Sequence, residues 1–121
     1  MRGVAAARDW LVSARKDGPL AISVVSITEL IGGMRTVERR EVWGLLASFR
    51  VERATEIIAR RAGDMMRRYR RSHSGIGLGD YLIAATADVQ GLQLATLNVR
   101  HFPMFEHLQA PFATAVQRPE P

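Results

Sequence analysis

The stretch "GIGLGDYLIAATADVQGLQLATLNVRHF" (residues 75–102) decides the fold, because it joins a glycine-rich loop to a helix and that helix to a strand. Asp80 stands where the helix should begin, and Gly91 follows its alanine-rich residues as a stop signal. The short apolar segment 92–96 comes directly after this glycine. We therefore expect a helix over 80–90 and a strand over 92–96.

The rest of the chain continues this alternation of helix and strand patterns. Apolar residues at helical spacing predict helices over 4–16, 26–34, 37–49 and 55–72. We expect Thr55 to cap the last of these, and its apolar stripe to face the core: Ile58, Ala62, Met65, Met66 and Tyr69. We expect strands over 20–25, within 49–54 and over 112–116. Such alternation predicts an α/β fold in three layers, with a short parallel sheet flanked by helices. We expect residues 1–116 to form a single domain and 117–121 to be a flexible tail.

Composition excludes several classes of protein. The 121 residues include no cysteine, which rules out disulfides and cysteine-ligated zinc or iron–sulfur sites. No apolar run approaches the roughly 20 residues that a bilayer crossing needs. We therefore expect a cytoplasmic protein without a membrane partner.

The charge is concentrated in arginine. The formal net charge is +5, from 17 basic residues of which all but Lys16 are arginine, against 12 acids. The planar guanidinium suits phosphates and carboxylates, so a polyanionic substrate or an acidic partner fits this composition. An arginine-rich exposed surface without a partner fits it equally well.

Three oxygen-bearing side chains are expected at one edge of the sheet. Glu29 follows the strand 20–25, Asp80 begins the helix that leads to the strand 92–96, and Asn98 follows that strand. Ligands of open α/β sheets bind at the carboxyl ends of the strands. Oxygen ligands from a few acids suit Mg²⁺ or Mn²⁺, which keep several waters.

Each of the three side chains also has an ordinary structural interpretation. Ser26 to Glu29 fits the capping-box pattern, in which the glutamate reaches back to the start of its own helix. Asp80 can cap its helix, and an asparagine after a strand is common in turns. Taken singly, these residues do not separate a metal site from helix capping.

Taken together, the motifs resemble a known family. "SVVSITELIGGM" (23–34), the stretch 75–102 and the arginine-rich helix between them resemble the PIN-domain fold, and specifically the VapC-type ribonuclease toxins of toxin–antitoxin pairs. The resemblance covers about residues 4–113. It implies a metal-dependent endoribonuclease that hydrolyses RNA phosphodiester bonds with Mg²⁺ or Mn²⁺. It further implies that Glu29 and Asp80 hold the metal, and that Thr96 and Asn98 match the fourth position of the catalytic site.

The resemblance also implies partners. A cognate VapB-type antitoxin is expected to cover the apolar N-terminal helices and the acidic site, in a heteromeric complex or beside a homodimer. RNA is the expected substrate. Arg67, Arg68 and Arg71 on the arginine-rich helix, with His101, are candidate RNA contacts. A solvated basic face is the alternative for these arginines, and a surface position is the alternative for His101.

The largest departure from the family pattern is at the start. Family members begin with a short apolar strand that ends in an aspartate, whereas this chain begins "MRGVAAARDW", which matches the family's first helix. We therefore expect the first, central strand and its aspartate to be missing from this chain. The start is either misassigned, or the chain is a truncated, catalytically impaired PIN-like module that only binds an antitoxin or partner.

A direct test follows from the missing carboxylate. Because one acid of a small cluster carries much of the charge that holds the cation, protein of this sequence should bind Mg²⁺ weakly and cleave little RNA. Cleavage of RNA by the pure protein, with and without EDTA, measures this. Robust EDTA-sensitive cleavage would contradict the expectation.

Overall fold

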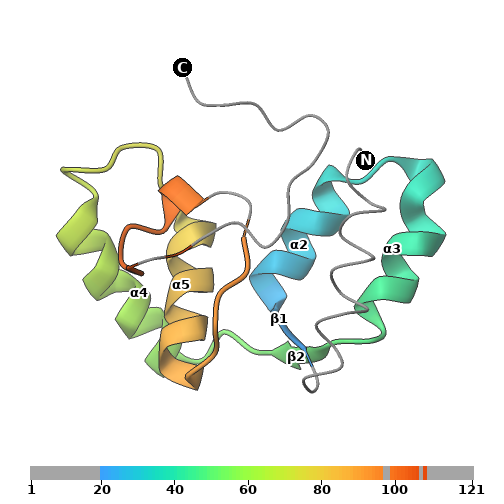
Figure 1. Ribbon diagram of the computed structural model, residues 1–121, viewed down its shortest axis with the longest axis horizontal. Helices are drawn as coiled ribbons and strands as arrows, with labels where there is room; N and C mark the ends of the chain where they lie inside the picture. Colours follow the sequence, from blue (N-terminus) through green and yellow to red (C-terminus); the bar gives the residue numbers. More distant parts are fainter. Residues whose placement is uncertain (1–19, 97–98, 107, 109–121) are drawn as a thin grey trace.

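The structure, a computed structural model, describes residues 20–96, 99–106 and 108 (Figure 1). The described elements are β1 (Ala21–Ser23), α2 (Val24–Gly33), η2 (Thr36–Glu38), α3 (Arg39–Leu46), β2 (Arg50–Glu52), α4 (Glu56–Tyr69), α5 (Leu78–Gln90) and η3 (Val99–His101). The expected helix 4–16, the expected strand 112–116 and the tail 117–121 lie outside the described residues. None of the described helices has the length and apolar character needed to cross a bilayer.

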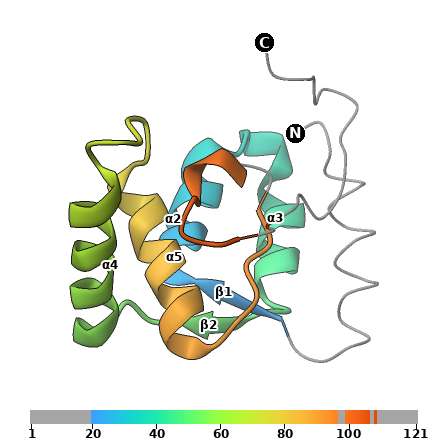
Figure 2. The same ribbon diagram turned by 60° about the vertical axis from the view of Figure 1, so that its left-hand side comes forward.

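The sheet and its helices confirm the predicted α/β class. β1 and β2 pair in parallel, with Ala21 opposite Arg50 and Ser23 opposite Glu52. Figures 1 and 2 show α4 and α5 packed side by side on one flank of this short sheet and α2 and α3 on the other. The brief strand predicted within 49–54 is thus confirmed as β2.

The strand predicted over 92–96 is wrong. These residues carry no strand assignment, since the described part of the chain offers them no neighbouring strand with which to form a ladder. Their exposure nevertheless alternates, with Leu92, Leu94 and Thr96 partly buried and Gln93 and Ala95 exposed. The apolar side of the segment still packs, because Leu94 contacts the hydrophobic core.

The boundary between β1 and α2 also differs from expectation. The predicted strand 20–25 ends at Ser23, because the Ser23 hydroxyl oxygen accepts a hydrogen bond from the backbone N–H of Ser26 at 2.9 Å. Ser23 therefore caps α2, and Val24 and Val25 enter the first turn of the helix. Ser26, which we expected to open the helix, lies inside it.

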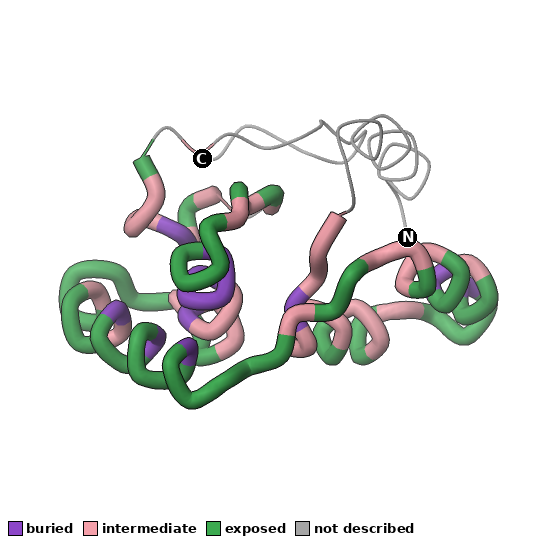
Figure 3. Tube along the Cα trace, turned by 90° about the horizontal axis from the view of Figure 1, so that it is seen from below, coloured by how far each residue is buried: buried purple, intermediate pink, exposed green. Residues whose placement is uncertain are grey.

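The core lies between α4 and α5. The apolar stripe predicted for the arginine-rich helix is confirmed, and Figure 3 shows buried positions along the facing sides of these helices. The buried cluster comprises Ile58, Ala62, Met65, Tyr81, Ala84, Ala85 and Phe102. Because Ala84 and Ala85 are small and fully buried, the two helices approach closely. Thr55 caps α4 as predicted, and Gly91 ends α5 in the left-handed conformation with φ of 65°.

Tyr81 is the largest polar side chain in this core. It is 1% exposed, and its hydroxyl has no hydrogen-bond partner among the described residues. Burial raises the pKa of the Tyr81 hydroxyl; the charge of Arg70 lowers it and that of Asp80 raises it further. The hydroxyl is therefore kept neutral next to the start of α5.

The Tyr81→Phe substitution tests this description. Removing a buried hydroxyl that has no partner should leave the free energy of unfolding unchanged or raise it by about 1 kcal/mol. Because the pKa of Tyr81 is raised in the folded state, the unfolded tyrosine ionises first, at a pH of about 10, and the free energy of unfolding should fall as pH rises above that value. The variant has no ionisable group at this position and should lack this fall. Urea unfolding at pH 7 and at alkaline pH measures both effects. A loss of more than about 1 kcal/mol at pH 7 would mean that the hydroxyl has a partner.

Candidate functional site

Glu29 lies in the second turn of α2 and its carboxylate reaches α5. Its Oε2 lies 2.7 Å from the position that a Cβ atom on Gly79 would occupy. The capping-box interpretation of Glu29 is therefore wrong, because Ser23 caps α2 and the backbone N–H of Ser26 is already bonded to it. The side chain of Glu29 is available for chemistry at the N-terminus of α5.

Asp80 is the third residue of α5, not its first. The helix begins at Leu78, and the Asp80 Oδ2 accepts a hydrogen bond from the backbone N–H of Gly77 at 3.1 Å. The capping interpretation of Asp80 is thus confirmed. A carboxylate in this turn is also stabilised by the helix dipole, which carries partial positive charge at this end.

His101 makes a second contact with the same carboxylate. Its Nδ1 lies 3.1 Å from Asp80 Oδ2, with the imidazole side chain 40% exposed and the Asp80 side chain 17% exposed. With a hydrogen on Nδ1, the ring donates to the carboxylate and fixes its orientation. The turn η3, which carries His101, lies beside the start of α5 in Figures 1 and 2.

Three segments far apart in sequence therefore meet at the N-terminus of α5. Glu29 comes from α2, Asp80 from α5 and His101 from η3. Two of the three predicted catalytic side chains, Glu29 and Asp80, are described, and Glu29 lies against Gly79, the neighbour of Asp80. Asn98 lies outside the described residues, and Thr96 ends the extended segment that leads to it.

The donor set matches the chemistry of a hard divalent cation. Two carboxylates at a helix N-terminus supply oxygen ligands and negative charge, and Mg²⁺ is commonly held by one or two carboxylates together with waters and substrate phosphates. Within residues 20–96, 99–106 and 108, no three histidine, aspartate or glutamate side chains lie close enough to hold an ion jointly. Among the described residues, Glu29 and Asp80 are therefore the acids that could hold such a cation, with its other coordination positions left to waters or substrate.

The basic face of α4 divides into two parts. Near its start, Arg60 pairs with Glu56 at 2.8 Å, and Arg61 pairs with Asp88 of α5 at 2.6 Å. Asp88 therefore links α5 to α4. Toward the other end, Arg67 and Arg68 are exposed, as is Arg71 in the turn that follows the helix, and no ion pair joins them to an acid in the described part of the chain.

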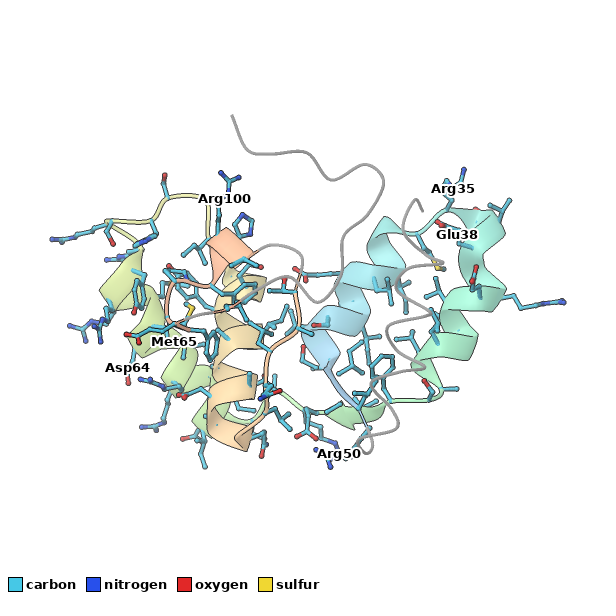
Figure 4. The ribbon with its side chains drawn as sticks, viewed as in Figure 1. Arg35, Glu38, Arg50, Asp64, Met65 and Arg100 are labelled. Atoms are coloured by element: carbon cyan, nitrogen blue, oxygen red, sulfur yellow. The ribbon has the colours of Figure 1, made fainter. Side chains whose placement is uncertain are left out.

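The exposed arginines lie at the same end of the molecule as the carboxylates. α4 ends at Tyr69 and α5 begins at Leu78, so one short loop connects the arginine-bearing end of α4 to the start of α5 (Figure 1). Asp64, by contrast, lies on the outer side of α4, away from Met65 and the core (Figure 4). The exposed arginines and the start of α5 are thus separated by a single loop.

Gly79 is the site residue that sequence reasoning missed. The pattern places the glycines of "GIGLG" in the loop before the helix, yet Gly79 lies inside α5 and directly faces the Glu29 carboxylate. The available signal was a glycine immediately before the acid, at a position where a helix would prefer another residue.

Comparisons with known proteins bear on the family and the fold of this chain. The family model described as PIN domain matches residues 2–106. A curated protein of Mycobacterium tuberculosis, Ribonuclease VapC10, is 83% identical over 119 residues, which are 98% of this chain and 90% of that protein. Ribonuclease VapC19 of the same organism is 43% identical over 113 residues, which are 93% of this chain and 90% of that protein.

A solved structure supports the fold independently. The chain superposes on a protein from a toxin–antitoxin complex of Klebsiella pneumoniae with a TM-score of 0.68. The alignment covers 91% of this chain and 90% of the other, at 23% sequence identity. At this identity the likeness concerns the fold alone.

Proposed function

We propose, from the premise that this chain belongs to the PIN-domain family and to its VapC-type ribonuclease toxins, that it hydrolyses RNA phosphodiester bonds with a divalent metal ion. The observation that carries the proposal is the meeting of Glu29 with the start of α5. A Glu29 oxygen lies 2.7 Å from the Cβ position of Gly79, the residue next to Asp80. The Glu29 carboxylate thus lies against the residue next to Asp80, at a helix end where the dipole favours negative groups.

Glu29 and Asp80 are the residues that would hold Mg²⁺ or Mn²⁺ in this chain. When bound, such an ion supplies an activated water and offsets negative charge at the phosphate. His101 holds the Asp80 carboxylate through its Nδ1, while the hydrogen bond from Gly77 fixes the same oxygen from the backbone. Asn98 belongs to the proposed catalytic set on the motif alone.

The exposed arginines complete the proposal on the substrate side. Arg67, Arg68 and Arg71 border the carboxylate end, and guanidinium groups bind phosphate oxygens well. We assign them to RNA contacts outside the reacting phosphodiester. We propose the cytoplasm as the site of action and a cognate VapB-type antitoxin as the partner, in a heteromeric complex or with a toxin homodimer.

A second candidate function is a module that binds its antitoxin or another partner without cleaving RNA. This candidate is favoured by the small number of possible metal ligands, because the described residues provide no group of three acids or histidines that could hold one metal ion. The two candidates differ in their metal binding. A module of this kind would bind no Mn²⁺ through Asp80.

Asp80→Asn tests the metal site. The substitution keeps an oxygen for the Gly77 N–H but removes the carboxylate charge, so the weak Mn²⁺ binding and the low EDTA-sensitive RNA cleavage expected of this sequence should both fall by a further factor of about ten or more. Titration calorimetry and a cleavage assay measure the two quantities. Asp64→Asn is the matched control, since Asp64 is exposed on α4 and should leave both unchanged. Equal affinity in the parent and the Asp80 variant would assign the chain to the binding-module candidate.

The arginine assignment is tested by salt dependence. Replacing Arg67, Arg68 and Arg71 by glutamine removes three proposed phosphate contacts, so the slope of log affinity against log salt should flatten by about 2 for single-stranded RNA. Fluorescence anisotropy with a labelled RNA measures the slope. Replacing the exposed Arg39, Arg40 and Arg53 removes the same charge elsewhere and should leave it nearly unchanged. Equal flattening in both triple variants would show that total charge, not this surface, binds RNA.

A further inference from the structure

We propose that Gly79 is a positioning residue, whose missing side chain seats the Glu29 carboxylate against the first turn of α5 beside Asp80. The proposal rests on the proposed function, because it concerns how the same two carboxylates are held together. It adds a residue that binds no metal itself and acts through Glu29.

The contact at Gly79 is unusually close. A Cβ atom there would lie 2.7 Å from Glu29 Oε2, 3.4 Å from Val25 Cγ1 and 3.5 Å from Glu29 Cδ. The first distance is well inside van der Waals contact, so a methyl group and the carboxylate oxygen would overlap. Other helical glycines have open space, since nothing in the described structure comes within 4 Å of the Cβ position of Gly44 or Gly63.

Backbone conformation gives no separate reason for glycine at this position. Positive φ angles occur at Gly75 and Gly91, and Gly79 is not among the described residues with this conformation. Gly79 is the second residue of α5, where any residue other than proline and glycine makes a more stable helix. The space that it leaves for Glu29 is therefore the physical consequence of its being glycine.

A side chain at position 79 would displace the carboxylate more readily than the backbone. Glu29 is exposed, and the atom in closest contact is the end of its flexible side chain, so rotation of that side chain relieves the overlap. The contact with Val25 would remain an ordinary one. The fold should thus survive, while the Glu29 carboxylate moves away from Asp80.

Gly79→Ala separates these two effects. Its urea unfolding midpoint should be equal to or higher than that of the parent, because alanine favours the helix, while Mn²⁺ affinity should fall by about tenfold. Gly63→Ala is the matched control in α4 and should raise the midpoint without changing Mn²⁺ affinity. Unchanged Mn²⁺ affinity in Gly79→Ala would overturn the proposal and leave the proposed function standing.

A double-mutant cycle tests whether the effect passes through Glu29. Glu29→Gln should weaken Mn²⁺ binding in the parent but have little further effect in Gly79→Ala, because the carboxylate has already been displaced. Additive losses would mean that Gly79 does not act through Glu29. A general weakening of the fold would lower the midpoint and would not produce this non-additivity.

A measurement without metal distinguishes failure of the proposal from failure of the proposed function. If the parent binds no Mn²⁺, the metal site is wrong, yet the contact itself can still be measured. Gly79→Ala should raise the urea midpoint more in a Glu29→Ala background than in the parent, because no carboxylate then has to move. An equal rise in both backgrounds would overturn the contact between Gly79 and Glu29.

Discussion

The close packing of α5 against α4 is the constraint on which the rest of the described structure depends. Ala84 and Ala85 are completely buried against Ile58 and Met65, so α5 cannot rotate or slide without opening the core. The first turn of α5 is consequently fixed in space, and Asp80 with it. Arg61 and Asp88 add an ion pair between the same two helices, although both side chains are partly exposed and the pair contributes little to stability.

The site is assembled around this fixed helix end by segments that have little stability of their own. α2 follows a strand of three residues, and η3 is a single turn. Glu29 and His101 nevertheless reach the same place, because one lies against Gly79 and the other contacts Asp80. Such a site gains precision from the rigid α4–α5 pair and retains adaptable side chains toward the substrate.

Patterns that are local in sequence could be predicted, and features that depend on distant neighbours could not. Thr55, Gly91 and the apolar stripe of α4 were correctly interpreted, because capping and helical periodicity act within one or two turns. Residues 92–96 have an alternating strand-like pattern but form no ladder, since strand formation needs a partner that the pattern does not specify. The pattern could not tell whether Ser23 or Ser26 caps α2, because serine suits a helix cap at either position. The hydrogen bond from the Ser26 N–H to the Ser23 hydroxyl oxygen identifies Ser23 as the cap. Glu29 and Asp80 could be named from their motif, whereas the role of Gly79 depends on a contact between helices fifty residues apart in sequence.

At the start of α5, helix stability and the space for the Glu29 carboxylate favour different residues at position 79. Stability alone would favour replacing Gly79 by a better helix former, and selection for a more stable domain would act in that direction. Retaining the space for Glu29 acts in the opposite direction. With the role proposed for Gly79, position 79 would be a local example of a trade-off between stability and activity, in which a slightly weaker helix keeps room for the Glu29 carboxylate.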